Sequence, residues 1–226
     1  MKKYLYVSPY YEEPSFKSYF NSINLINNTD WLTTNNHLIL NKKNLKKTSL
    51  FNYLENNSNK YDLIFFCSNS ILLNKIEIIK LSKSNKLDEA IKIFIRKKTN
   101  YLLGICLGMQ LLFEDSEEGV EKGLGLIKGN IIKFKSNNNA FKIPHMGWNY
   151  VEKNSPISKF NLIKQRFYFA HSYYAKIKND NLNSYTSNYI EKFPAIVEHD
   201  NILGFQFHPE KSHIYGKNIL NEFIKL

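Results

Sequence analysis

The chain has 226 residues, of which 43% are hydrophobic and 15% aromatic. This length suits one α/β domain or two small ones, and the apolar content excludes a disordered or fibrous protein. No apolar run reaches the roughly 18–20 residues of a membrane span, and Pro9 comes too early for a signal peptide. We therefore expect a soluble cytoplasmic protein with no membrane partner, in which Cys67 and Cys106 are free thiols.

The net charge of +11 raises the question of a nucleic-acid partner. Only two of the 31 basic residues are arginines, Arg96 and Arg166, whereas asparagine occurs 30 times. Lysine and asparagine are encoded by AT-rich codons, so mutational bias explains much of the lysine excess. The lysines are also scattered, whereas phosphate-binding surfaces cluster their basic residues. The sequence therefore predicts no nucleic-acid partner, and a basic face toward an anionic metabolite or an acidic partner stays open.

The first hundred residues alternate short apolar runs with longer amphipathic stretches. The runs predict strands at Tyr4–Val7, His37–Leu40, Tyr61–Phe66 and Tyr101–Cys106. Apolar residues spaced by three and four predict helices at Ser15–Ile26, Lys47–Asn56 and Leu87–Lys98. This alternation predicts an α/β fold with a doubly wound, mostly parallel sheet flanked by helices.

The pattern changes after Gly125, where short strand-like runs are separated by Gly, Asn, Asp and Pro. The expected strands are Leu126–Phe134, Trp148–Val151, Phe167–Phe169, Tyr173–Ile177, Ala195–Glu198 and Leu203–Phe207. A closing helix is expected at Lys217–Leu226. No linker separates the two halves and no repeat is present, so residues 1–226 are predicted to form one domain with added antiparallel strands in its C-terminal half.

The segment Gly104-Ile-Cys-Leu-Gly-Met-Gln110 has the pattern of a nucleophile elbow with a thiol in place of a hydroxyl. The apolar run Tyr101–Leu103 enters it, and an apolar helix, Gln110–Phe113, is expected to follow. The two glycines allow a tight turn from strand to helix, and the helix N-terminus stabilises a thiolate. A cysteine alone is more often a buried, inert residue. Glycines on both sides favour Cys106 as a nucleophile.

A nucleophilic thiol needs a proton carrier that a third group holds in place. Of the six histidines, His208 has the most suitable setting, because an apolar strand ends in His208-Pro209-Glu210. Residues i and i+2 lie on one side of an extended backbone, and Pro209 is expected to keep Glu210 out of a helix. The alternative is an ordinary surface pair. The candidate catalytic residues are therefore Cys106, His208 and Glu210.

The elbow and the His-Pro-Glu segment together resemble the class I (triad) glutamine amidotransferases. Within them, the chain is similar to the glutaminase subunit of imidazole glycerol phosphate synthase. The closer resemblance rests on Gly104–Phe113, Ser116-Glu117-Glu118, Lys122–Leu126, Pro144-His-Met-Gly-Trp-Asn149, Tyr168–Tyr173 and Gly204–Ser212. It runs from about Tyr101 to the C-terminus, which is more than half of the chain.

The resemblance implies that Cys106 attacks the amide of glutamine and that His208, oriented by Glu210, moves the protons. Ammonia would pass to a (β/α)8-barrel cyclase, bound as a heterodimer, for imidazole glycerol phosphate formation in histidine biosynthesis. The resemblance implies neither a metal nor an organic cofactor.

The resemblance also implies roles for residues outside the triad. The backbone N–H of Leu107 would serve the oxyanion hole. Five residues would lie at the glutamine: Gln110, Glu118, His171, Ser172 and Tyr173. Trp148 and Lys211 would lie near the partner interface. Without the resemblance, Trp148 and Tyr173 could equally be core aromatics, and Lys211 a solvated surface lysine.

The N-terminal hundred residues depart from the family. Its glycine-rich first turn is replaced by Tyr6–Pro14, and its Pro-Gly-Val-Gly oxyanion segment by Cys67-Ser-Asn-Ser70. A paralogous glutaminase that supplies another acceptor, for example in sugar amidination for surface polysaccharides, is therefore the alternative. A non-catalytic basic binding protein is a further alternative, against which the intact triad argues.

Overall fold

A computed structural model describes residues 87–136, 141–155, 158–162, 164–177 and 182–226, together with the backbone of five N-terminal strands. These strands are β1 (Tyr4–Ser8), β2 (Thr29–Thr33), β3 (Leu38–Asn41), β4 (Asn44–Lys47) and β5 (Leu63–Ser68). The predicted helix Ser15–Ile26 lies outside the described residues, as does Lys47–Asn56 apart from Lys47, which ends β4.

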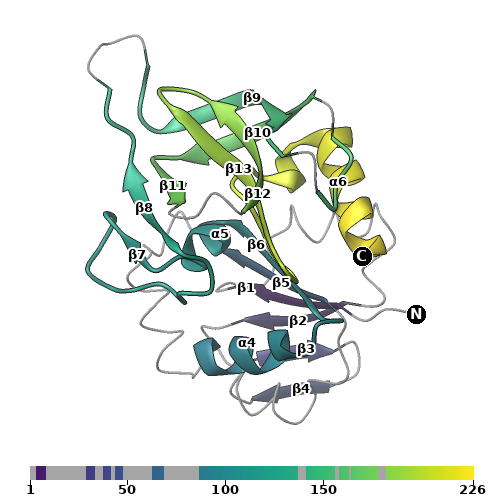
Figure 1. The fold of residues 1–226 in the computed structure, drawn as a ribbon. Coiled ribbons are helices and arrows are strands. Elements are labelled where there is room, and N and C mark those ends of the chain that lie inside the picture. Colours follow the sequence, from purple (N-terminus) through teal and green to yellow (C-terminus); the bar gives the residue numbers. More distant parts are fainter. Residues whose placement is uncertain are drawn as a thin grey trace.

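The rest of the chain forms nine strands and four helices within the described residues (Figure 1). The helices are α4 (Leu87–Arg96), α5 (Leu107–Leu111), the 3-10 helix η3 (Pro209–Lys211) and α6 (His213–Lys225). The strands are β6 (Tyr101–Cys106), β7 (Asp115–Ser116), β8 (Gly129–Lys133), β9 (His145–Lys153), β10 (Lys164–His171), β11 (Tyr173–Ile177), β12 (Asn183–Asn188), β13 (Lys192–His199) and β14 (Ile202–Phe205).

Eleven strands form one mixed sheet in the order β10-β9-β12-β13-β14-β6-β5-β1-β2-β3-β4. Neighbours from β14 through β6, β5 and β1 to β2 are parallel, and the pairs toward both edges are antiparallel. A second sheet has the order β11-β8-β7. The α/β prediction is confirmed, as are the added antiparallel strands, and the parallel pairing is confined to the five central strands.

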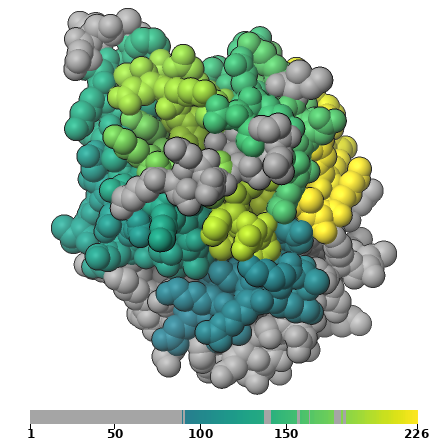
Figure 2. Space-filling model, viewed as in Figure 1, coloured from purple at the N-terminus to yellow at the C-terminus, as the bar shows by residue number. Residues whose placement is uncertain are grey.

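Helices cover both faces of the central strand β6, which is buried from Leu102 to Cys106. Leu103 and Ile105 pack in one core cluster with Phe223 of α6. Leu102 packs on the opposite face with Phe94 of α4. Because strand side chains alternate between faces, this division explains the near-continuous apolar run Tyr101–Cys106. Figure 2 shows α4, in blue, and the C-terminal residues, in yellow, as separate parts of the surface.

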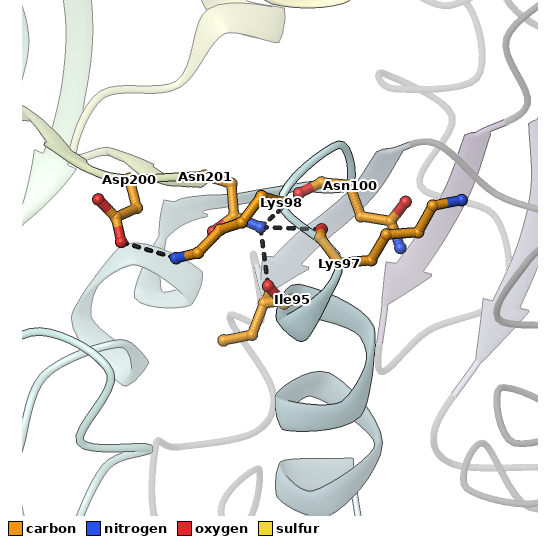
Figure 3. Close-up of polar contacts among 6 residues, drawn as sticks. All are labelled: Ile95, Lys97, Lys98, Asn100, Asp200 and Asn201. Atoms are coloured by element: carbon orange, nitrogen blue, oxygen red, sulfur yellow. Dashed lines mark hydrogen bonds and ion pairs between the residues drawn. The ribbon is translucent and has the colours of Figure 1, made fainter.

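Asn201 joins the end of α4 to the turn between β13 and β14 (Figure 3). Its side-chain Nδ2 donates to the carbonyl oxygens of Asn100, at 2.6 Å, and Ile95, at 3.0 Å. The backbone carbonyl of Asn201 accepts from the N–H of Leu102, at 3.0 Å. These bonds satisfy carbonyls that the helix end leaves unpaired. They also align the starts of β6 and β14, so that the carboxyl ends of these parallel strands meet at one edge of the sheet.

Most predicted elements have different bounds in the structure. The strand predicted from Leu126 begins at Gly129, because the N–H groups of Leu126 and Ile127 bond to the carbonyl of Leu112 instead of to a strand. The closing helix begins earlier than predicted, at His213. The strands Tyr101–Cys106 and Tyr173–Ile177 have the predicted bounds.

Candidate active site

Cys106 lies at a sharp turn between β6 and α5, as predicted. Its backbone has φ 52° and ψ −110°, outside the regions that most residues adopt. Such strain persists only where the surrounding structure enforces it, and it is common at active sites. The helix after this turn is Leu107–Leu111, so it begins directly after the cysteine and earlier than the predicted Gln110–Phe113. The backbone N–H of Leu107 therefore stands next to the sulfur-bearing residue.

Two glycines leave room for α5 to cross the sheet closely. A Cβ on Gly104 would lie 2.6 Å from the carbonyl oxygen of Gly108, closer than real contacts allow. Gly204 of β14 pairs in register with Gly104, and its Cβ would lie 2.6 Å from Cγ of Met109. The elbow therefore depends on Gly204 in the neighbouring strand as well as on Gly104.

Gly104→Ala is expected to destabilise the fold by about 1–3 kcal/mol, because the new methyl group would push against α5 backbone. Gly125→Ala is the control, since that glycine has φ 63° but open space around it. It should cost only about 1–2 kcal/mol of backbone strain and should leave the elbow in place. Urea unfolding measures both costs. A Gly104→Ala variant with the unfolding free energy of the wild-type protein would contradict the close crossing.

His208 follows β14 and is held to Glu210 by a hydrogen bond of 2.8 Å between Nδ1 and Oε1. Both side chains are buried, at 5% and 0% exposure. The predicted contact is present, but the expectation that Pro209 keeps Glu210 out of a helix is wrong. Glu210 lies in η3, and Pro209 is its first residue, a position for which the fixed φ of proline is suited.

The charge of His208 is governed by its neighbours. Burial lowers the pKa of His208, but the neighbouring Cys106 and Glu210 raise it by more, to about 10. Nε2 of His208 is buried and makes no hydrogen bond of standard geometry within the described residues. The arrangement favours the protonated imidazolium form of His208.

Cys106→Ser is expected to lower the pKa of His208, because the substitution removes one of the groups that raise it. In the wild-type protein the imidazolium should persist until the pH rises through about 10, and in the variant it should deprotonate at lower pH. An NMR titration of the His208 ring measures the change. An unchanged midpoint would mean that the sulfur and the imidazole do not interact.

Ser212 holds the histidine in place, a role that was not predicted from the sequence. Its buried hydroxyl donates to the carbonyl of His208, at 2.6 Å, and accepts from the N–H of Tyr168, at 2.9 Å. The N–H of His208 donates in turn to the carbonyl of Tyr168, at 2.8 Å. Serine after a proline-led turn is a possible signal for such a role, but only the register of β10 reveals its partner.

The residues predicted at the glutamine are partly brought together. Nε2 of the buried Gln110 donates to the carbonyl of Tyr173, at 3.0 Å, and to Oε1 of Gln206, at 3.2 Å. Burial, followed by the charges of Glu118 and Glu117, raises the pKa of Tyr173, which places Glu118 near that ring. Ser172 is half-buried between β10 and β11.

His171 lies deeper than its predicted role suggested. It is 5% exposed, and its ring nitrogens face the carbonyl of Tyr173 and the ring of His145. It is therefore placed to support the segment beside it. His145 and Gln206 are further buried polar residues to which the sequence analysis gave no role.

The two predicted interface residues lie on the surface. Trp148 is 40% exposed and stacks on the ring of His213, with the centroids 5.5 Å apart. Lys211 is exposed and lies two residues before His213. The outer face of β9 also exposes Met146 and Tyr150.

Among the described residues, no group of histidines, cysteines and carboxylates is arranged to hold a metal ion. In the same part of the chain, no helix has the length and apolar character needed to cross a membrane.

An α/β sheet with a cysteine elbow and a buried His–Glu pair is the arrangement typical of cysteine-dependent hydrolases. The model of the family "Glutamine amidotransferase class-I" matches residues 81–226, and the chain belongs to this family. Two solved structures share the fold over nearly the whole chain. One, a glutamine amidotransferase, covers 98% of this chain and 97% of its own with a TM-score of 0.66 at 12% identity. The other, a glutamine amidotransferase from Thermotoga maritima, covers 100% and 82% with a TM-score of 0.59 at 16% identity.

Curated relatives are more similar over a shorter region. Imidazole glycerol phosphate synthase subunit HisH 2 of Methanococcus maripaludis is 52% identical over 134 residues, which are 58% of this chain and 65% of that protein. Subunit HisH of Methanocaldococcus jannaschii is 48% identical over 55% of this chain and 63% of its own. Subunit HisH of Bacillus subtilis is 42% identical over 62% and 68%. The chain thus matches about two thirds of the length of these relatives.

Proposed function

We propose that the chain is the glutaminase subunit of imidazole glycerol phosphate synthase. Its role would be to release ammonia from glutamine for a partner cyclase in histidine biosynthesis. The buried Nδ1–Oε1 bond of 2.8 Å between His208 and Glu210, next to the strained Cys106, carries the proposal. The names of the curated relatives support the choice of pathway.

The first half of the reaction would form a thioester. The Cys106 thiolate attacks the side-chain amide carbon of glutamine, and the N–H of Leu107 stabilises the oxyanion. The His208 imidazolium gives its proton to the amide nitrogen, the C–N bond breaks and ammonia leaves. The raised pKa of His208 supports this order, because the acid is already protonated when glutamine binds.

The second half would restore the enzyme. Neutral His208 takes a proton from water, the resulting hydroxide attacks the thioester, and the C–S bond breaks to give glutamate and the thiolate. His208 is then protonated again. Glu210 holds Nδ1 throughout, so that Nε2 is the nitrogen that exchanges protons with the reacting atoms.

The outer face of β9 would bind the (β/α)8-barrel cyclase. It exposes Met146 at 63%, Trp148 at 40% and Tyr150 at 49%. The guanidinium of Arg166 on β10 lies 5.8 Å from the Trp148 ring and 6.0 Å from the Tyr150 ring. Tryptophan, tyrosine and arginine are the residues that dominate the energy of protein interfaces. Lys211, near His213, would lie at the border of the same face.

The test is turnover with the cognate barrel partner, using glutamine or ammonium salts as the nitrogen source. We expect both to support imidazole glycerol phosphate formation, and glutamine hydrolysis to rise when the partner and its ligand are added. If glutamine is hydrolysed but ammonia never reaches this acceptor, the chain serves a different synthase. If glutamine is not hydrolysed under any condition, the proposal fails.

A further inference from the structure

Two buried histidines face each other across the β9–β10 pair. His145 and His171 are cross-strand partners, and they are 3% and 5% exposed. Nδ1 of His145 lies 3.2 Å from Nε2 of His171. At the other side of the His171 ring, Nδ1 lies 2.8 Å from the carbonyl oxygen of Tyr173. Both residues are almost fully buried, so their ring nitrogens are expected to find partners within the protein.

The partners determine the direction of every hydrogen bond. The carbonyl of Tyr173 can only accept, so Nδ1 of His171 carries the proton and Nε2 of a neutral His171 accepts. Nδ1 of His145 must then donate, which leaves its Nε2 to accept from Nδ2 of Asn149, 3.4 Å away. Asn149 is itself held by a bond of 2.8 Å from Nδ2 to the carbonyl of Asn188. The chain of bonds closes only when both histidines are neutral.

The chain of bonds ends at the segment proposed to bind glutamine. The carbonyl of Tyr173 accepts from His171 and also from Nε2 of Gln110, at 3.0 Å. Its two acceptor positions are therefore used by side chains from two separate elements, β10 and α5. The other end of this series of hydrogen bonds lies on β9. The alternate β9 residues Met146, Trp148 and Tyr150 face outward.

We propose that His145 and His171 are positioning residues, which hold the Tyr173 carbonyl and, through it, Gln110 in the geometry that binds glutamine. This inference rests on the proposed glutaminase function. It gives these two histidines a role separate from that of His208. Because the pair starts on the strand that carries the exposed Trp148 face, the same bonds connect that face with the glutamine segment.

The surroundings keep the pair neutral. The ring of His145 stacks between Phe169, with centroids 5.0 Å apart, and Tyr189, at 4.0 Å. Burial lowers the pKa of His145 to about 4. Burial, together with the charges of His145 and His208, lowers the pKa of His171 to about 3, although its bond to Tyr173 opposes this. A neutral His171 also adds no positive charge beside the His208 imidazolium.

The kinetic test compares His171→Leu, His171→Asn and His145→Phe. His171→Leu leaves the Tyr173 carbonyl without a buried donor and is expected to raise KM for glutamine about 10- to 100-fold, with little change in kcat. His171→Asn keeps a donor at the position of Nδ1 and should recover much of the loss. His145→Phe keeps the stacking but removes the donor to His171, so it should raise KM as well.

Phe193→Leu is the matched control, because Phe193 packs on His171 but takes no part in the bonds. If Phe193→Leu raises KM as much as His171→Leu, or if asparagine rescues nothing, the histidines only fill the core and the proposal is overturned. A wild-type protein that hydrolyses no glutamine would instead overturn the proposed function.

An NMR measurement tests the pair without using activity. In 15N-labelled protein at about pH 7, both rings are expected in the neutral form with the proton on Nδ1. His145→Phe should shift the Nε2 resonance of His171, which loses its donor. A proton on Nε2 of His171, or a cationic form of either ring, would overturn the proposal, whether or not the protein is a glutaminase.

Discussion

Cys106→Ser is expected to reduce glutamine-dependent turnover by about 10⁴-fold or more, because no other group in the site can form the thioester. Turnover of the partner cyclase with free ammonium should remain near the wild-type value. The thiolate is needed only to liberate ammonia, and a serine in its place retains the shape of the elbow. Steady-state assays with the two nitrogen sources measure both quantities.

Cys67→Ser is the control for this variant. Cys67 lies in β5, pairs with Ile105 of β6, and has no predicted role in the reaction. The Cys67→Ser variant should therefore keep glutamine-dependent turnover. If Cys106→Ser hydrolyses glutamine at the wild-type rate, or if Cys67→Ser is as inactive as Cys106→Ser, the nucleophile is assigned to the wrong residue.

His208→Asn is expected to lower glutamine-dependent turnover by about 10³- to 10⁴-fold, and Glu210→Gln by only about 10- to 100-fold. The imidazole moves a proton in both halves of the reaction, whereas Glu210 orients it and helps to raise its pKa. The amide of a glutamine at position 210 can still accept from Nδ1 of His208. Measuring kcat with glutamine for both variants separates the two roles.

The alkaline limb of the pH profile provides a second readout. Glu210→Gln removes one of the groups that raise the pKa of His208, so activity should be lost at a lower pH than in the wild-type protein. Ammonium-dependent turnover serves as the control. A Glu210 variant that is more impaired than the His208 variant would reverse the assigned roles.

The features that the sequence predicted well are local. The run Tyr101–Cys106 is buried on both faces, so its composition alone marks it as a central strand. The glycines around Cys106 indicate the elbow, because only a residue without a side chain permits so close a crossing. His208 and Glu210 are near neighbours, so their contact needs no knowledge of the fold.

The features that the sequence could not predict depend on tertiary pairing. The strand Asn183–Asn188 is rich in asparagine and serine, which have low strand propensity, and it forms by pairing between β9 and β13. The alignment of Gly204 with Gly104 joins residues far apart in the sequence. The bond between His145 and His171 likewise follows from the register of two strands.

The effect of the residues that depart most from the family remains a prediction. The segment Cys67-Ser-Asn-Ser70 was expected to affect the oxyanion hole. Its first two residues end β5, and the other two lie outside the described residues. The N–H of Leu107 remains the oxyanion donor that we propose.

The most direct test of the central claim is to look for the thioester itself. The protein, with its barrel partner, would be mixed with glutamine, quenched in acid during turnover and digested for mass spectrometry. We expect a glutamyl group on the peptide that contains Cys106, and no such group in Cys106→Ser. Glutamine turnover without this adduct, or an adduct on Cys67 instead, would contradict the account.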